Sequence, residues 1–535
     1  MPIDTPLLHA PPFPGADATV SRTGDAAITK PVAPTVIDRL FAAIRAARVG
    51  GCFWAAPATP GSATTIVRGS LAEAESLLDR ADSATVLAVP RDDATDPWSL
   101  LRGGLTLIAH GDDPWVALAI IAGCEVRLLS AGRFGVPGAD PAAQRGRVAA
   151  DLLHTRYRNP YTGATAGIDE TVALLAEWRR LFEANRGIVA GCGFCWWKRR
   201  EIARFLWTPT QRLRFFRSEA SALGYARRQG GAVAVWPSRI SAAMVEQAAA
   251  QGVPLVRVED GFVRSVGLGS NLVPPSSVTV DRRGIHYDPA RESDLEHLLA
   301  HDDFPPALLA RAAHLRETIV RAGISKYASG GAHVFPERVP GKRLVLVSGQ
   351  VEDDMSVRLG GAGLTSNLDL VRRARALEPD AEVWFRPHPD VDAGHRAGAV
   401  RDADALLHAD RVVRGGGMAA LLDIVDGVHV LTSLSGFEAL LRGRDVTCHG
   451  VPFYAGWGLT RDLAAVPDRR GRALTLDALV AGVLIAYPRY LDPVTGLPCA
   501  PEILIRRMQD GAAHNRLGWV TRVKQVQGRL MKRRI

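Results

Sequence analysis

The segment KRLVLVSGQVEDDMSVRLGGAGLTSN, residues 342–367, decides the fold. Its apolar run at 344–347 has the length and the β-branched content of a strand buried in a parallel sheet. Ser348 and Gly349 end the strand. Three carboxylates follow, at Glu352, Asp353 and Asp354. Open α/β sheets bind ligands beyond the carboxyl ends of their strands, so the sequence predicts a reaction centre here.

Composition limits the class of protein. The chain has 535 residues, more than one hydrophobic core usually serves, so about two to four domains are expected. Its 47% hydrophobic content is that of a globular protein. We find no apolar run of membrane-spanning length and no signal-type N-terminus. Six cysteines in so long a chain give no disulfide framework. These features predict a cytoplasmic protein.

The charge of the chain indicates an anionic partner. The net charge is +9, which leaves nucleic acid, lipid headgroups, a nucleotide donor and an acidic glycan open. Residues 514–535 carry basic but no acidic side chains, and apolar residues recur there at helical spacing. One interpretation is a basic amphipathic helix on an anionic membrane face. A solvated tail is the alternative.

An internal similarity indicates a duplication. Residues 156–163, RYRNPYTG, resemble residues 489–496, RYLDPVTG, and a strand, a helix ending at glycine and a short strand precede each copy. The hydroxyls and the glutamate of 432–438 have no counterpart at 109–115. We interpret residues 36–180 as the eroded remnant of a first module. Chance similarity between two α/β units is the alternative.

The first lobe of the intact module is expected to begin near residue 187. Its strand at 254–258 runs into EDGFVRSVGLGS, where acids, an arginine and glycines give charge and backbone freedom close to a ligand. A structural ion pair between glutamate and arginine is the alternative. Cys192 and Cys195 form a Cys-x-x-Cys pair without a second pair, which favours structural cysteines over metal or redox chemistry. No metal-ligand cluster is apparent.

Two further strand ends are expected in the second lobe. The strand at 382–385 ends in Arg386, and His388 follows between two prolines that stiffen its backbone. Arginine beside histidine suits a phosphate-bearing leaving group, with a structural histidine as the alternative. The strand at 428–431 delivers hydroxyls and a glycine to a helix start, where anions bind, although Ser435 also fits a plain N-cap. In that helix Glu438 is placed to accept from ribose hydroxyls.

A set of motifs between residues 190 and 500 identifies the family. In order, they are WWKRREIARFL, RVEDGFVRSVGLGSNLVPPSS, GIHYDPARESDLE, SKY, SGQVEDDMS, RPHPDVDAG, TSLSGFEALLRG and VPFYAGWGLT. Together they resemble the KpsC-type capsular polysaccharide synthesis proteins, the β-Kdo glycosyltransferases of bacterial capsules. Members of that family carry two transferase modules in tandem. This chain resembles the second module complete, with the first reduced to the remnant.

The resemblance implies a GT-B-like α/β fold, with two Rossmann-like lobes and the donor CMP-Kdo between them. It also implies retention of configuration through a sugar adduct on a carboxylate, with Asp354 as nucleophile and Glu259 as general acid/base. His388 completes the catalytic set and stabilises the departing CMP. No metal and no cofactor beyond the donor are implied. The expected substrate contacts are Asp260, Arg264, Ser265, Gly349, Gln350, Glu352, Asp353, Arg386, Pro389, Thr432, Ser433, Ser435, Gly436, Glu438 and Tyr454.

The resemblance also sets the expected organisation and partners. The expected parts are a flexible start (1–35), the α/β remnant (36–180), an acceptor-side lobe (187–335), a CMP-sugar-side lobe (341–510) and a basic tail (511–535). The partners would be a CMP-sugar, a lipid-linked or oligosaccharide acceptor, the inner-membrane surface and capsule export machinery, but no nucleic acid. Another CMP-sugar as donor, or a non-catalytic assembly or export role, are the alternatives. The retained acids and histidine argue against the non-catalytic role.

Overall fold

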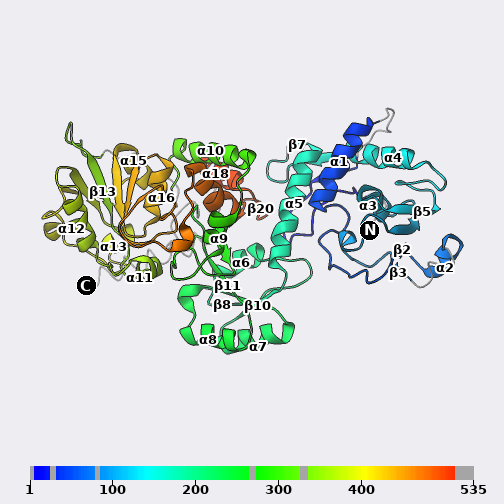
Figure 1. Cartoon of the computed structure of the whole chain (residues 1–535), viewed down its shortest axis with the longest axis horizontal. Helices are drawn as coiled ribbons and strands as arrows, with labels where there is room; N and C mark the ends of the chain where they lie inside the picture. The colour runs from blue at the N-terminus through cyan, green and yellow to red at the C-terminus, as the bar shows by residue number, and fades with distance from the viewer. Residues whose placement is uncertain (1–4, 24–31, 79–84, 264–272, 326–334, 512–535) are drawn as a thin grey trace, which may run out of the picture. The chain divides into compact units, whose positions relative to one another are not determined.

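The computed structural model describes residues 5–23, 32–78, 85–263, 273–325 and 335–511. The chain forms two compact units (Figure 1). The first comprises Met1–Arg186 and Leu206–Arg212, and the second comprises Gly187–Phe205 and Leu213–Ile535. Residues 512–535 of the predicted basic tail lie outside the described residues, and so do Arg264 and Ser265.

The first unit contains a four-stranded parallel sheet. Its order is β3 (Val86–Val89), β2 (Thr65–Arg68), β4 (Thr106–His110) and β5 (Glu125–Ser130). The longer helices are α1 (Pro34–Ala47), α3 (Pro114–Ala122), α4 (Pro141–His154) and α5 (Ile168–Asn185). Helix α3 is buried from Trp115 to Ala122, and its N-cap Asp113 forms a buried ion pair with Arg68 (Oδ2–Nε 3.3 Å). Residues 36–180 therefore form a small α/β core.

A hairpin in the first unit repeats a hairpin of the second. Strands β6 (Arg156–Arg158) and β7 (Thr165–Ala166) pair like β19 (Pro488–Leu491) and β20 (Pro498–Cys499). The turn begins at Asn159 or Asp492, whose side chain accepts from the amides two and three positions on at 2.9–3.3 Å. The turns end at Gly163 and Gly496, whose φ angles are +77° and +72°. The N–H of each glycine donates to the carbonyl of Asn159 or Asp492, respectively, at 2.8 Å. This shared geometry supports the duplication hypothesis.

The first lobe of the second unit is built on a seven-stranded sheet. Four parallel strands form its core: β9 (Arg214–Phe216), β8 (Ile188–Cys192), β10 (Ala232–Val235) and β11 (Leu255–Asp260). Strand β12 (Ser277–Asp281) continues the sheet in the antiparallel sense. The helices are α6 (Arg199–Phe205), α7 (Glu219–Gln229), α8 (Ala242–Ala250), α9 (Asp294–His301) and α10 (Pro306–Arg321).

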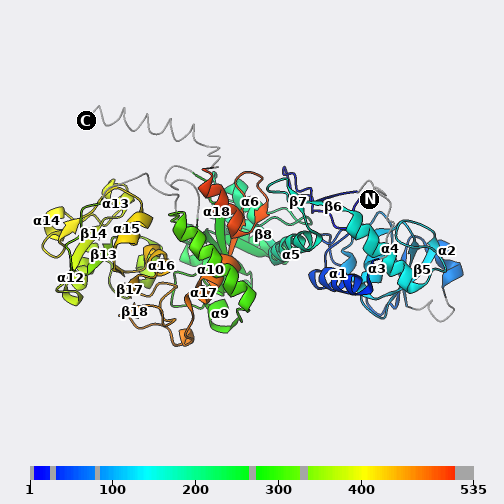
Figure 2. The same ribbon diagram turned by 90° about the horizontal axis from the view of Figure 1, so that it is seen from above.

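The C-terminal part of the chain returns to this first sheet. Strand β19 pairs with β12, and β20 pairs with β19. Helix α18 (Pro501–Gln509) lies with the first-lobe helices in both views (Figure 2), and its Glu502 binds Arg311 of α10 (Oε1–Nε 2.6 Å). The expected lobe boundary at residue 510 is therefore wrong. Strands β19 and β20 belong to the first sheet because their backbone groups pair with the otherwise open edge at β12.

The second lobe carries a six-stranded sheet in which every pairing is parallel. Its order is β15 (Arg411–Val412), β14 (Glu382–Arg386), β13 (Leu344–Ser348), β16 (Gly427–Val430), β17 (Asp445–Cys448) and β18 (Arg461–Asp462). The main helices are α11 (Met355–Gly360), α12 (Asn367–Leu377), α15 (Met418–Ile424) and α16 (Leu434–Leu441).

The predicted strand at 344–347 is the centre of this second sheet. Every residue of β13 is buried. The chain runs outward from β13 through β14 to β15 and then returns to β16 on the other side of β13, so the strand order reverses between β13 and β16. Ligands bind at such a reversal. The prediction of a GT-B-like α/β fold with two Rossmann-like lobes is confirmed.

Candidate active site

A cavity of about 950 Å³ lies at the carboxyl ends of both sheets of the second unit, a size suited to a small-molecule ligand. Among the expected site residues, the following line it: Glu259, Asp260, Gly349, Gln350, Asp353, Asp354, Arg386, His388, Pro389, Thr432, Ser433, Ser435 and Glu438. The two lobes therefore share one candidate site, to which each contributes acids.

The acids of the first lobe end strand β11. Asp260 Oδ1 lies 3.0 Å from Lys198 Nζ, and Lys198 lies 3.5 Å from the centre of the Trp236 ring. The side chains of Asp260 and Lys198 are only 20% and 10% exposed, so this ion pair is shielded from water. The structural alternative, an ion pair between the glutamate and the arginine of this loop, stays untested because Arg264 lies outside the described residues. The ion pair with Lys198 positions Asp260, and Glu259 Oε1 accepts from the Asp260 N–H at 3.0 Å.

Asp354 faces the cavity from the second lobe, where it is the N-cap of α11. Its Oδ1 accepts from the N–H of Ser356 at 2.9 Å and from the Ser356 hydroxyl at 2.8 Å. Two donors on one oxygen fix the orientation of the carboxylate. The second oxygen, Oδ2, is then the atom that can react.

The other two acids of the segment 342–367 have different environments. Asp353 lines the cavity, is 59% exposed, and binds Arg396 (Oδ1–Nη2 3.0 Å). Glu352 is absent from the cavity wall, because its carboxylate accepts from the N–H of Asn367 at 2.7 Å at the start of α12. The expectation that Glu352 contacts substrate is therefore corrected: its side chain satisfies a helix N-terminus.

Tyr287 lies in the same cavity as the two candidate catalytic acids and was not anticipated. It follows β12, lines the cavity, and among the described residues its buried hydroxyl has no hydrogen-bond partner. Burial, and then the charges of Glu259 and Asp354, raise the pKa of Tyr287. The hydroxyl thus stays protonated within the field of both carboxylates. No motif signalled this role, because Tyr287 lies in a turn rather than at the end of a parallel strand.

A buried cation lines the second-lobe wall. Arg386 is 7% exposed and donates to the carbonyls of Gly415 (2.9 Å) and Gly416 (2.8 Å). Desolvation lowers the pKa of Arg386. Within the part of the chain that the structure describes, no carboxylate forms an ion pair with it. A buried guanidinium without an acid attracts an anionic ligand.

His388 lies beside this cation at the start of a short helix. Its Nδ1 accepts from the N–H of Asp390 at 3.2 Å. Nδ1 then carries no proton, so the neutral imidazole carries its proton on Nε2. This tautomer can donate a hydrogen bond from Nε2 to an anion in the cavity.

Hydroxyls line the cavity where the strand order reverses. Gln350 Oε1 accepts from the Thr432 N–H at 2.7 Å and its Nε2 donates to Thr432 Oγ1 at 3.0 Å, which joins the ends of β13 and β16. The Oγ of Ser435 lies 2.8 Å from that of Ser433 and 2.9 Å from that of Ser348. The N-cap of α16 is Ser433, so the plain alternative that made Ser435 the N-cap is wrong. These groups form a polar wall next to Arg386 and His388.

Two expected contacts lie inside the second lobe instead. Tyr454 is completely buried and its hydroxyl donates to the Ser433 carbonyl. A Cβ on Gly436 would lie 2.3 Å from that hydroxyl, so glycine is required for the ring to fit. The expectation that Tyr454 and Gly436 contact substrate is corrected: this pair supports the Ser433 turn from behind. Within the motif VPFYAGWGLT, an aromatic, glycine-rich loop at residues 451–460, only Pro452 and Phe453 line the cavity.

Several cavity residues were not anticipated from the sequence. They are Trp236, Ser238, Phe262, His286, Tyr287, Ser356, Arg358, Arg396 and Met418. The expectation from the sequence that no metal is involved stays untested. The described residues include one group of three metal-ligating side chains, Glu292, His297 and His301, none of which lines the cavity.

Comparison with known proteins places the chain in a family. The family model described as "Capsule polysaccharide biosynthesis protein" matches residues 231–339 and 333–490. The chain is 39% identical over 329 residues to the lipopolysaccharide-processing protein LpsZ of Rhizobium meliloti. The match covers 60% of this chain and 74% of LpsZ. The chain belongs to the KpsC-type family of capsule polysaccharide biosynthesis proteins.

Solved structures of the KpsC-type family agree with the fold. The β-Kdo 2,4 transferase of Thermosulfurimonas dismutans KpsC is 32% identical with a TM-score of 0.54, over 61% of this chain and 99% of that chain. The β-Kdo 2,7 transferase of the same KpsC is 33% identical with a TM-score of 0.50, over 60% and 99%.

The chain is also 40% identical over 363 residues to the capsule polysaccharide modification protein LipA of Neisseria meningitidis serogroups A and B. The match covers 67% of this chain but 51% of LipA, so the chain spans about half the length of those relatives. Among the described residues, no helix has both the length and the apolar composition that crossing a bilayer requires.

Proposed function

We propose that this protein is a glycosyltransferase of capsule polysaccharide biosynthesis that moves Kdo from CMP-Kdo to a glycan or glycolipid acceptor with retention of configuration. One observation carries the proposal: Glu259 and Asp354 enter one cavity from different lobes, and the Tyr287 hydroxyl lies in the field of both. Retention by double displacement needs two such carboxyl groups. The similarity to two β-Kdo transferases supports Kdo as the sugar.

In the first proposed step, Asp354 Oδ2 attacks the anomeric carbon of Kdo. The bond from that carbon to the CMP phosphate oxygen breaks, and CMP leaves with the bonding electron pair. Arg386 and Nε2–H of His388 would stabilise the phosphate as its charge grows. The hydroxyls at the start of α16 line the same wall and would receive the nucleotide.

In the second step, an acceptor hydroxyl replaces the enzyme carboxylate. Glu259 takes the proton of that hydroxyl, its oxygen attacks the anomeric carbon, and the Asp354 carboxylate is released. Tyr287 would donate a hydrogen bond to whichever carboxylate carries the greater negative charge. These roles require no metal ion in the cavity.

The Arg386→Gln variant is expected to bind CMP at least about tenfold more weakly, because a charge-assisted hydrogen bond to phosphate contributes about 1.5–3 kcal/mol. Calorimetric titration with CMP measures the change. Arg396→Gln is the matched control, since Asp353 already balances the charge of Arg396, and its affinity should change less than about threefold. Equal losses in the two variants would contradict the role of Arg386.

The Tyr287→Phe variant is expected to lower kcat about 10- to 100-fold without loss of stability. The hydroxyl makes no hydrogen bond among the described residues, so its removal leaves no partner unsatisfied. Steady-state transfer assays and thermal unfolding measure the two effects. Tyr490→Phe is the control: its buried hydroxyl donates to the Leu484 carbonyl at 2.6 Å, so this variant should lose stability but keep kcat. An unchanged kcat in Tyr287→Phe would argue against the mechanism.

The proposed function is tested with purified protein, CMP-Kdo generated in situ and a lipid-linked acceptor. Mass analysis of the product should show added Kdo. Analysis of the new glycosidic bond should show the same anomeric configuration as in CMP-Kdo. If sugar is transferred only from a different CMP-sugar, that sugar and not Kdo is the donor substrate. Binding of CMP without transfer from any CMP-sugar would favour a non-catalytic role.

A further inference from the structure

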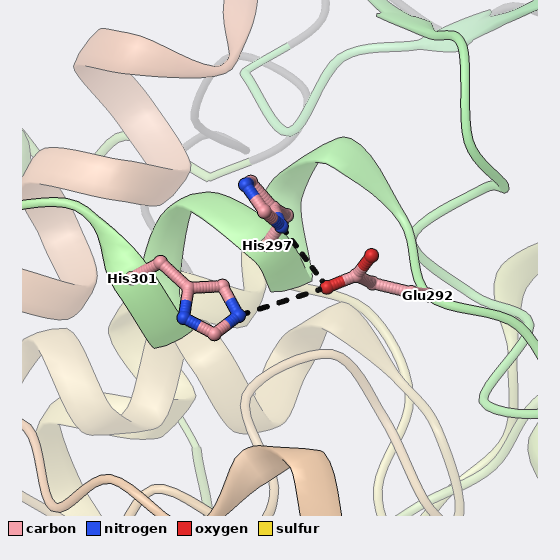
Figure 3. A group of neighbouring side chains, drawn as sticks. All are labelled: Glu292, His297 and His301. Carbon is pink, nitrogen blue, oxygen red and sulfur yellow. Dashed lines mark hydrogen bonds and ion pairs between the residues drawn. The ribbon is translucent and has the colours of Figure 1, made fainter.

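A cluster of metal-ligating side chains lies on helix α9, outside the cavity. Glu292 immediately precedes the N-cap Ser293, and His297 and His301 lie one helical turn apart on the same face. Figure 3 shows the carboxylate of Glu292 directed toward both imidazole rings. Its Oε1 lies 3.1 Å from His297 Nδ1 and 3.9 Å from His301 Nε2.

The spacing of these atoms approaches that of a metal site. One donor atom from each of the three residues lies within 4.8 Å of the others. Zinc binds nitrogen and carboxylate oxygen at about 2.0–2.2 Å, so tetrahedral ligands lie roughly 3.3–3.5 Å apart. Small rotations of exposed imidazoles therefore suffice to close the cluster around an ion. Two histidines and one carboxylate also leave a fourth position for water.

The backbone around the cluster is fixed before any ion binds. Ser293 Oγ accepts from the Glu296 N–H at 3.0 Å, and the N–H of Asp294 donates to the buried Asp281 at 2.9 Å. A Cβ on Gly284 would lie 2.6 Å from the Glu292 carbonyl oxygen, so the preceding loop packs tightly against Glu292. A fixed backbone lowers the entropy cost of assembling ligands.

The local charge is compatible with a cation. Arg283 is the nearest competing cation, with Nε 3.8 Å from Oε2 of Glu292 and 3.5 Å from Asp294 Oδ1. It lies on the other oxygen of the Glu292 carboxylate and leaves Oε1 to the histidines. The three side chains are 35%, 39% and 60% exposed in chain order, so an ion can reach them from solvent.

We propose that Glu292, His297 and His301 form a binding site for one divalent transition-metal ion, with Zn²⁺ as the expected occupant. Imidazole with carboxylate favours such ions over Mg²⁺ and Ca²⁺, which prefer oxygen ligands alone. The ion fastens the end of the loop 282–292 to α9. The same loop carries His286 and Tyr287 into the cavity, so the metal restrains the segment that presents Tyr287.

The test is a calorimetric titration of the whole chain with Zn²⁺ after a chelator has removed bound metal. We expect the wild type to bind one equivalent of Zn²⁺. In His297→Ala, His301→Ala and Glu292→Gln this binding should be lost, or its affinity should fall at least about tenfold. His314→Ala removes an exposed histidine of the neighbouring helix α10 and should leave the affinity unchanged. Melting of the metal-free variants, expected to match the metal-free wild type, checks that they fold.

A second probe reports on the ligands directly. Co²⁺ in place of Zn²⁺ should give the intense visible absorption of a tetrahedral site, which the three variants should lose. The proposal is overturned if wild type binds Zn²⁺ with a Kd above about 100 μM. It is also overturned if the variants bind as tightly as wild type, or if equimolar Mg²⁺ displaces the ion.

Discussion

Replacement of Asp354 by asparagine is expected to lower the rate of sugar transfer at least about 1,000-fold, because the nucleophile is removed while its surroundings are kept. Asparagine retains an oxygen that can accept from Ser356, so the N-cap of α11 should survive. Asp354→Ala should lose transfer equally and also about 1 kcal/mol of stability with the cap. CMP affinity, measured by calorimetry, should change less than about threefold in both variants, since neither alters Arg386 or His388.

The matched control for this prediction is the neighbouring acid. Asp353→Asn removes an exposed carboxylate from the same cavity wall and should change the rate less than about tenfold. Glu259→Gln provides a further check, because the second step should slow and a sugar adduct should accumulate on the peptide that contains Asp354. Peptide mass analysis measures the adduct. Transfer at the wild-type rate in Asp354→Asn would exclude Asp354 as the nucleophile.

Acidification from pH 7 to pH 5 is expected to lower the free energy of unfolding of the second unit by about 4 kcal/mol through two buried histidines. His429 and His449 lie 2.9 Å apart (Nδ1–Nε2) and are 1% and 3% exposed. Burial, and then the charges of Arg461 and Arg343, lower the pKa of His429 to about 4. Burial and the neighbouring imidazole lower the pKa of His449 to about 3.

The sign of this effect follows from which state binds the protons. In the unfolded chain both imidazoles titrate near about 6.5, so below that pH the unfolded state takes up protons that the folded state refuses. Stability is therefore complete above about pH 6.5 and is lost as the pH falls toward 4. Each histidine accounts for about 2 kcal/mol between pH 7 and pH 5.

Urea unfolding at the two pH values measures the prediction. His429→Gln should remove about half of the difference between pH 7 and pH 5, although its stability at pH 7 falls as well. His314→Gln, at an exposed position, should leave the difference unchanged. The same difference in wild type and His429→Gln would show that other groups cause the acid sensitivity.

The sequence predicted those parts of the site that follow directly from strand ends. Strand β13 is a continuous apolar run buried on both faces, and such runs are recognised from composition alone. Asp354, Arg386, His388 and Ser433 each come within a few residues of such a strand. Because parallel strands present their carboxyl ends at one edge, their convergence on a single cavity could be foreseen.

The remaining site residues depend on contacts between distant parts of the chain. Tyr287 follows an antiparallel strand, and only the pairing of β12 with β11 brings it near Glu259. Tyr454 belongs to an aromatic, glycine-rich loop, a pattern that fits a ligand platform and a buried support equally well. The difference is decided by Gly436, whose missing Cβ admits the ring. His297 and His301 have helical spacing, but Glu292 joins them only through the fold of the preceding loop.

The return of β19 and β20 to the first sheet has a consequence for dissection of the protein. The polypeptide passes between the lobes of the second unit twice, once ahead of β13 and once ahead of β19. The two lobes are therefore tied by two connections rather than one. A fragment cut at the first connection would also remove the outer strands β19 and β20 from the first sheet, so neither lobe is a self-contained piece for expression or domain exchange.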